Sequence, residues 1–239
     1  QKWCRSKDGA LWGHIVDTES GKAAEEDFQE FVDAVSASGG PVNPALKWSP
    51  SFSSGGDAPP ATASMVFVPG ASGVGKRWPV ENFIEVARRL LSACPGIRLM
   101  VVGSQAEWEL GARISEALHG QVENLCGKTD LLKLAAVLAP PDGGGKVVVS
   151  NDTGTAHLAA IQGTQTVVVL GGADFNVFFP SKSRANVHAV FHRMDCFGCE
   201  WRCRYADLGR ETAPCIAETR VDDVVMAVKE CLYDDNAAL

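Results

Sequence analysis

The 239-residue sequence predicts an α/β protein built on one Rossmann-like parallel sheet with flanking helices. Two observations predict this class. From residue 64 onward, short apolar runs alternate with amphipathic segments of helical length. The apolar runs are continuous, without a polar residue at every second position, which is typical of parallel strands buried on both faces.

The expected elements follow one another in a regular order. We expect strands at residues 65–68, 97–102, 122–125, 147–149, 166–170 and 187–190. Helices are expected at 80–93, 106–118, 130–138, 155–161 and 221–232. The first helix shows the reasoning, because apolar residues such as Phe83, Ala87 and Leu90 recur at helical spacing and Pro95-Gly96 stops the pattern.

Residues 1–63 differ from the folded part expected at 64–239. They contain one expected helix, at 24–35, and a stretch at 51–60 whose Ser, Gly and Pro content is typical of a linker. This is too little periodic structure for a domain. The sequence begins with Gln1 instead of Met, which we interpret as a fragment or a processed form.

The composition excludes several classes of protein. The formal net charge is −7, from 22 Lys and Arg against 29 Asp and Glu, and a non-specific nucleic-acid binder needs the opposite balance. No apolar run approaches the ~20 residues of a membrane span, and no signal peptide opens the chain. The eight cysteines are spread too unevenly for a disulfide-stapled secreted domain, so we expect a cytoplasmic protein.

Five loops at the expected carboxyl ends of the strands are rich in glycine and small polar residues. They are residues 70–76, 103–107, 127–129, 151–157 and 171–174. Ligands of such sheets bind at this edge, where glycines allow close backbone approach and helix N-termini favour anions. Five such loops together indicate a ligand that carries phosphate, although each alone is compatible with a tight turn.

The first of these loops also matches the P-loop pattern G-x-x-x-x-G-K, from Gly70 to Lys76. Two residues argue against a P-loop. Arg77 stands where a hydroxyl should bind Mg²⁺, and Pro79 is tolerated only if the helix starts after the lysine. A P-loop-like NTPase is therefore the alternative function, not the preferred one.

Taken together, the segments resemble a known family. V-F-V-P-G-A-S at 66–72, K-R-W-P at 76–79 and D-T-G-T-A-H-L-A-A at 152–160 resemble glycosyltransferase family 9, the ADP-heptose:lipopolysaccharide heptosyltransferases. The resemblance implies the C-terminal half of a GT-B fold, which binds the nucleotide-sugar donor in an inverting transfer. Residues 1–63 would then be a remnant of the N-terminal acceptor domain plus the linker.

The resemblance also implies a site for the donor diphosphate. Lys76 matches the phosphate-binding lysine, and Ser72 lies beside it as a hydroxyl donor. Thr153, Gly154 and His157 match the place where the diphosphate meets a helix N-terminus. A lysine and helix amides stabilise the charge that grows on the leaving group, so no metal cofactor is required. His157 lies on an otherwise apolar helix face, and taken alone such a histidine is more often packed in the core than a ligand contact.

Two acidic residues complete the donor site that the resemblance implies. Glu107 matches the acid that takes the ribose hydroxyls, and Asp152 lies where the family holds the sugar or its phosphate neighbourhood. Each has a structural alternative, since Glu107 also favours the start of its helix and Asp152 is also a suitable helix cap. Trp78 is expected to pack in the core.

The general base of the family belongs to the N-terminal domain, and the nearest acids, Asp8, Asp17 and Glu19, match no motif. We therefore expect donor binding with poor transfer unless a missing domain or a partner chain completes the enzyme. The acceptor would be a lipopolysaccharide-like or other surface saccharide, with peripheral contact to the inner membrane. A non-catalytic binding module is the further alternative, and the nucleotide, sugar and acceptor stay open.

Four cysteines crowd one stretch near the C-terminus: Cys196, Cys199, Cys203 and Cys215. Four thiolates can hold a structural zinc ion, and Cys196 and Cys199 form one C-x-x-C pair. The second C-x-x-C pair that is usual in such sites is missing, so reduced thiols or disulfides are alternatives.

Overall fold

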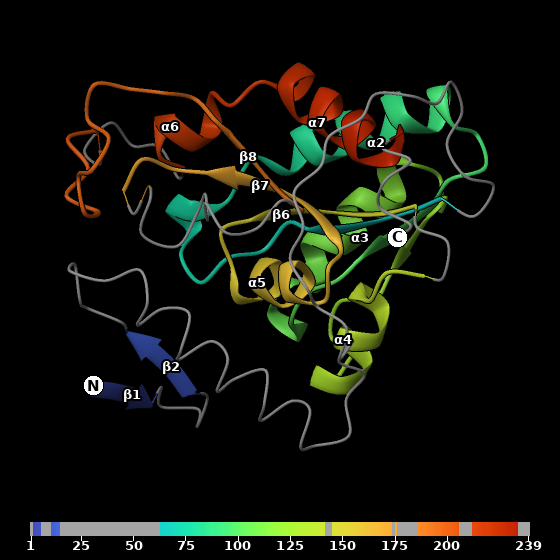
Figure 1. The fold of residues 1–239 in the computed structure, drawn as a ribbon, viewed down its shortest axis with the longest axis horizontal. Coiled ribbons are helices and arrows are strands. Elements are labelled where there is room, and N and C mark those ends of the chain that lie inside the picture. Colours follow the sequence, from blue (N-terminus) through green and yellow to red (C-terminus); the bar gives the residue numbers. More distant parts are fainter. Residues whose placement is uncertain are drawn as a thin grey trace. The chain divides into compact units, whose positions relative to one another are not determined.

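The computed structural model divides the chain into two compact units, residues 1–42 and 43–239 (Figure 1). It describes residues 2–5, 11–14, 63–141, 145–173, 175, 186–205 and 212–233. In the first unit, β1 (Lys2–Arg5) pairs antiparallel with β2 (Leu11–His14), a pairing that the sequence did not predict. The expected helix at 24–35 and the linker at 51–60 lie outside the described residues.

The second unit contains a six-stranded sheet in which every pairing is parallel. Its strands are β3 (Ser64–Val68), β4 (Arg98–Val101), β5 (Val122–Asn124), β6 (Lys146–Asn151), β7 (Gln165–Leu170) and β8 (Val187–Phe191). Their order in the sheet is β5-β4-β3-β6-β7-β8. This is the order of a Rossmann fold, so the predicted fold class is confirmed.

The helices also lie where the apolar spacing predicted them. They are α2 (Val80–Ala93), α3 (Trp108–Ala117), α4 (Leu131–Leu138), α5 (Gly154–Ile161) and α7 (Val221–Tyr233). Two 3₁₀ turns, η1 (Val74–Lys76) and η2 (Gln105–Glu107), and the short helix α6 (Pro214–Ala217) were not expected. The predicted helix 106–118 is thus divided into η2 and α3.

Alternate residues of each strand pack against different helix layers. In β3, Met65 and Phe67 belong to the core formed with α2, α3 and α7, whereas Val66 and Val68 pack with α4 and α5. Figure 1 shows α2 and α7 on one side of the sheet and α4 and α5 on the other. Because side chains alternate along a strand, burial on both faces explains why the strand sequences are continuously apolar.

The strand order reverses between β3 and β6, which are neighbours at the centre of the sheet. In open α/β sheets, ligands bind at the carboxyl edge beside this reversal. The loops that follow β3 and β6 are therefore the first place to look for a site. Among the described helices, none is both long enough and apolar enough to cross a membrane.

Candidate functional site

Asn151 joins the two loops at the reversal point. It ends β6 and is fully buried. Its Oδ1 accepts a hydrogen bond from the backbone N–H of Trp78 at 2.9 Å, and its Nδ2 donates to the carbonyl oxygens of Pro69 and Gly70 at 2.9 and 3.1 Å. One buried carboxamide therefore fixes the loop after β3 against the end of β6. The strand was expected to end at 149, and no feature of the sequence indicated this role for Asn151.

Lys76 lies in this fixed loop, at the end of η1. The Arg77 guanidinium donates twice to the carbonyl oxygen of Ala71, at 3.2 and 3.1 Å, and the Thr212 hydroxyl donates to the carbonyl oxygen of Arg77 at 3.0 Å. The helix that follows, α2, begins only after Pro79. A P-loop lysine opens its helix, so this geometry does not favour the NTPase alternative.

Trp78 packs in the core, as expected from the sequence. Its side chain is 1% exposed and meets Phe83 edge to face at 5.1 Å between ring centroids. The indole N–H donates to the carbonyl oxygen of Thr219 at 3.1 Å. The residue anchors the lysine loop to the segment between α6 and α7.

Asp152 follows Asn151 and lies at the N-terminus of α5. The cap of this helix is Thr153, whose hydroxyl accepts from the backbone N–H of Ala156 at 3.3 Å. Capping therefore does not account for Asp152. Its Oδ1 lies 3.9 Å from Nε2 of His157, and both side chains are partly exposed. His157 thus lies beside Asp152 at the edge and is not a packed core histidine, and Gly154 is exposed at the first position of the helix.

Glu107 lies on the other side of the lysine loop, after β4. Its Oε2 accepts from the backbone N–H of Ser104 at 2.7 Å and from the Ser104 hydroxyl at 2.9 Å, so it closes a capping box at η2. A Cβ on Gly70 would lie 1.7 Å from Oε1 of Glu107. The carboxylate is therefore packed against the loop after β3. The expectation that Glu107 favours the start of its helix is correct for Oε2, which caps η2.

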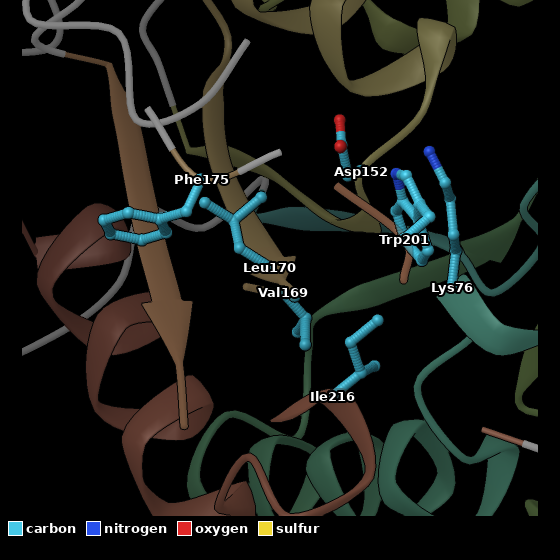
Figure 2. A pocket seen from close by; sticks show the side chains of 8 residues that line it. Lys76, Asp152, Val169, Leu170, Phe175, Trp201 and Ile216 are labelled. Carbon is cyan, nitrogen blue, oxygen red and sulfur yellow. The ribbon is translucent and has the colours of Figure 1, made fainter. Parts of the chain in front are cut away.

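A pocket of about 310 Å³, its mouth included, opens at this edge. Its lining comprises two charged side chains and a largely apolar wall: Lys76, Asp152, Val169, Leu170, Gly171, Phe175, Trp201 and Ile216. Figure 2 shows Lys76, Asp152 and Trp201 gathered at one side of the pocket. The structure therefore brings Lys76 and Asp152 together, whereas Glu107 and the exposed Ser72 lie elsewhere along the edge.

Comparison with known proteins gives the same assignment. The model of glycosyltransferase family 9 (heptosyltransferase) matches residues 27–203. The chain belongs to glycosyltransferase family 9. The resemblance of the segments at 66–72, 76–79 and 152–160 is thereby confirmed.

Individual relatives of this family 9 chain are heptosyltransferases. Lipopolysaccharide heptosyltransferase 2 of Salmonella typhimurium is 31% identical over 126 residues, which cover 51% of this chain and 34% of the relative. Lipopolysaccharide heptosyltransferase 1 of Pseudomonas aeruginosa is 29% identical over 163 residues, which cover 68% and 39%. The matched part thus spans less than half the length of either relative.

A solved structure supports the same fold for this family 9 chain. ADP-heptose lipopolysaccharide heptosyltransferase II of Escherichia coli superposes with a TM-score of 0.57 at 23% identity. The match covers 72% of this chain and 47% of that protein. The Rossmann-like sheet described above is therefore the fold shared with a GT-B heptosyltransferase.

The four clustered cysteines of this family 9 chain line a second pocket, of about 370 Å³. Cys196, Cys199, Cys203 and Cys215 all contribute to it, and each is a free thiol. Burial raises the pKa of Cys215, and its Sγ lies 3.5 Å from the backbone nitrogen of Gly172. Within the part of the chain that the structure describes, no three Cys, His, Asp or Glu side chains are arranged to hold a metal ion.

Proposed function

We propose that this family 9 chain is the donor-binding half of an inverting GT-B glycosyltransferase, with ADP-heptose or a related nucleotide sugar as its donor. The observation that carries the proposal is that Lys76 and Asp152 line the same pocket. This pocket lies at the point where the strand order of the sheet reverses, beside the N-terminus of α5. The heptosyltransferase names of the relatives support heptose as the sugar.

This chain's residues suit one side of that chemistry. In the transfer, the acceptor oxygen bonds to the anomeric carbon while the bond from that carbon to the diphosphate breaks. The electron pair leaves with the nucleoside diphosphate, so negative charge grows there. The Lys76 ammonium and the first backbone amides of α5 stabilise that charge, and Asp152 accepts hydrogen bonds from sugar hydroxyls. Glu107 is proposed to hold the ribose hydroxyls through Oε1, with Ser72, Thr153, Gly154 and His157 around the diphosphate.

The acceptor side is proposed to come from elsewhere. The acceptor hydroxyl must lose a proton to a general base, and Asp8, Asp17 and Glu19 lie outside the described residues. We infer that an N-terminal acceptor domain or a partner chain supplies this base. The acceptor is a lipopolysaccharide-like or surface saccharide, and the enzyme works in the cytoplasm with peripheral contact to the inner membrane.

The experiment is calorimetric titration of the chain with ADP, GDP, UDP and ADP-heptose, with and without Mg²⁺. We expect Mg²⁺-independent binding of ADP and ADP-heptose. Lys76→Ala removes a charged hydrogen bond to the diphosphate and should weaken binding about 10- to 100-fold. Lys133→Ala is the matched control, because it removes the same charge from the exposed face of α4.

Each other outcome assigns a different function. Equal losses in Lys76→Ala and Lys133→Ala would mean that only net charge matters and that Lys76 is not a phosphate contact. Binding of a nucleoside diphosphate that requires Mg²⁺ would restore the NTPase alternative. Binding of none of the four ligands would leave the non-catalytic module.

We also propose that the thiol pocket holds a structural zinc ion. Its support is the convergence of four cysteines from two segments on one pocket. In the structure they do not surround a common point, so their side chains would turn inward to form a tetrahedral site. Elemental analysis of the purified chain should find about one zinc per chain, lost in Cys199→Ser. A zinc-free chain that is as stable as one refolded with zinc contradicts the proposal.

A further inference from the structure

Trp201 and Gly171 lie between the two pockets, and Trp201 is the one of the two with a side chain that can contact a ligand. Trp201 lines both the pocket of Lys76 and Asp152 and the pocket of the four thiols. It is 41% exposed, so one side of the indole is open to a ligand. Figure 2 shows the indole alongside the Lys76 side chain, with Asp152 near both. No motif in the sequence singled out this position for the donor site.

The backbone of the turn that carries this indole has an unfavourable conformation. Glu200 and Trp201 both have positive φ angles, 50° and 63°, in a region that residues with a Cβ seldom adopt. The turn is held against the segment after β7, because Gly198 N donates to the carbonyl oxygen of Gly172 at 2.7 Å and Glu200 N donates to that of Ala173 at 3.3 Å. Strain of this kind persists where surrounding structure fixes it, often at functional sites.

The indole contacts the phosphate-site lysine directly. Nζ of Lys76 lies 4.2 Å from the centroid of the Trp201 ring, which is a cation–π contact. A lysine side chain has many rotamers, so a fixed aromatic face reduces the entropy that binding must remove. The indole also excludes water from one side of the ammonium and so strengthens its attraction for an anion.

The strand order indicates which end of the donor lies near this residue. Glu107 follows β4, Lys76 follows β3, Asp152 follows β6, and Leu170 ends β7. These positions run in one direction along the edge. With the ribose at β4 and the diphosphate at Lys76, the transferred group extends toward β7 and therefore toward Trp201. Sugars carry C–H groups that pack against aromatic rings.

We propose that Trp201 is a positioning residue of the donor site, which holds Lys76 for the diphosphate and packs against the transferred sugar. The inference rests on the proposed function, because it needs a nucleotide sugar in this pocket. It adds a residue from the thiol-bearing segment to a pocket whose two charged side chains come from the loops after β3 and β6. The segment at 194–205 thereby takes part in donor recognition.

Three variants test the proposal in the full chain. Trp201→Leu keeps an apolar side chain and removes the π face, whereas Trp201→Phe keeps a ring. We expect Trp201→Leu to bind ADP about 3- to 5-fold more weakly and ADP-heptose about tenfold more weakly, and Trp201→Phe to stay within about twofold of the wild type. Met226→Ala, exposed on α7, is the control for unrelated surface change.

Tryptophan emission supplies a readout that a purely structural role would leave unmoved. The emission lost in Trp201→Phe belongs to Trp201, and we expect it to change on addition of ADP-heptose because the transferred sugar then packs against the exposed indole. If Trp201→Leu binds ADP and ADP-heptose as tightly as the wild type, and Lys76→Ala still binds them more weakly, the inference is overturned and the proposed function stands. Equal losses in the Leu and Phe variants, with unchanged Trp201 emission, also overturn it. A wild type that binds no nucleotide removes the proposed function first, and the inference with it.

Discussion

The two walls of the pocket that we propose for the donor are built in opposite ways. The wall with Lys76 and Asp152 is fixed by a buried side chain, Asn151, which hydrogen-bonds three backbone groups of the loop after β3. The wall with Trp201 belongs to residues 192–205, which contain neither helix nor strand. Its described attachments include backbone hydrogen bonds to Gly172 and Ala173 and a turn at positive φ.

The difference suits two parts of a nucleotide sugar. The diphosphate is common to all such donors and needs cations and amides at fixed positions, because preorganised charge stabilises a leaving group most. The sugar differs from one donor to another, and an irregular segment tolerates sequence change without disturbing the sheet. We therefore expect substitutions at the first wall to act on folding and on all donors, and substitutions at the second to act on the choice of sugar.

The largest effect is expected at Asn151. Asn151→Ala leaves the N–H of Trp78 and two carbonyl oxygens without this partner in a buried place, and should lower the free energy of unfolding by about 2–4 kcal/mol. Urea denaturation measures this change. Asn82→Ala, which removes the same group from a partly exposed position on α2, should stay within about 0.5 kcal/mol of the wild type. Similar urea midpoints for Asn151→Ala and Asn82→Ala would show that the Asn151 hydrogen bonds stabilise the fold no more than a partly exposed side chain does.

The fold was predictable because its signals are local. The bounds of α2 follow from helical spacing between two prolines, Pro79 and Pro95, and from the polar residues that separate apolar positions. The continuous apolar strands predicted burial on both faces, and the two core clusters confirm it. Even the loops of the site were predictable, since every parallel strand delivers its following loop to the same edge.

The parts that could not be predicted depend on contacts between distant residues. Asn151 and its partner Trp78 are 73 positions apart, so nothing local marks the carboxamide as the joint between two loops. Trp201 reaches Lys76 through a left-handed turn made of residues that carry no signal for one. Spacing showed that four cysteines lie close together in the sequence, but it did not show that they line one pocket or how their side chains are directed.

A smaller effect, on affinity alone, is expected at Gly70. A Cβ there would lie 1.7 Å from Oε1 of Glu107, so Gly70→Ala must push the carboxylate away. Because the glutamate side chain is flexible, the fold should survive. If Oε1 holds the ribose, calorimetry should show ADP binding about tenfold weaker, since one hydrogen bond from a charged group is lost.

Gly75→Ala is the matched control for this substitution. Gly75 lies in the same loop, next to Lys76, and nothing lies within 4 Å of the Cβ that alanine would add. The ADP affinity of Gly75→Ala should therefore equal that of the wild type, although Gly75 is closer to Lys76 in sequence than Gly70 is. Equal affinities for Gly70→Ala and Gly75→Ala would mean that Glu107 serves only as the cap of η2. ADP would then be held mainly through its diphosphate at the first wall. Contacts to its ribose would have to come from another loop at the carboxyl edge of the sheet.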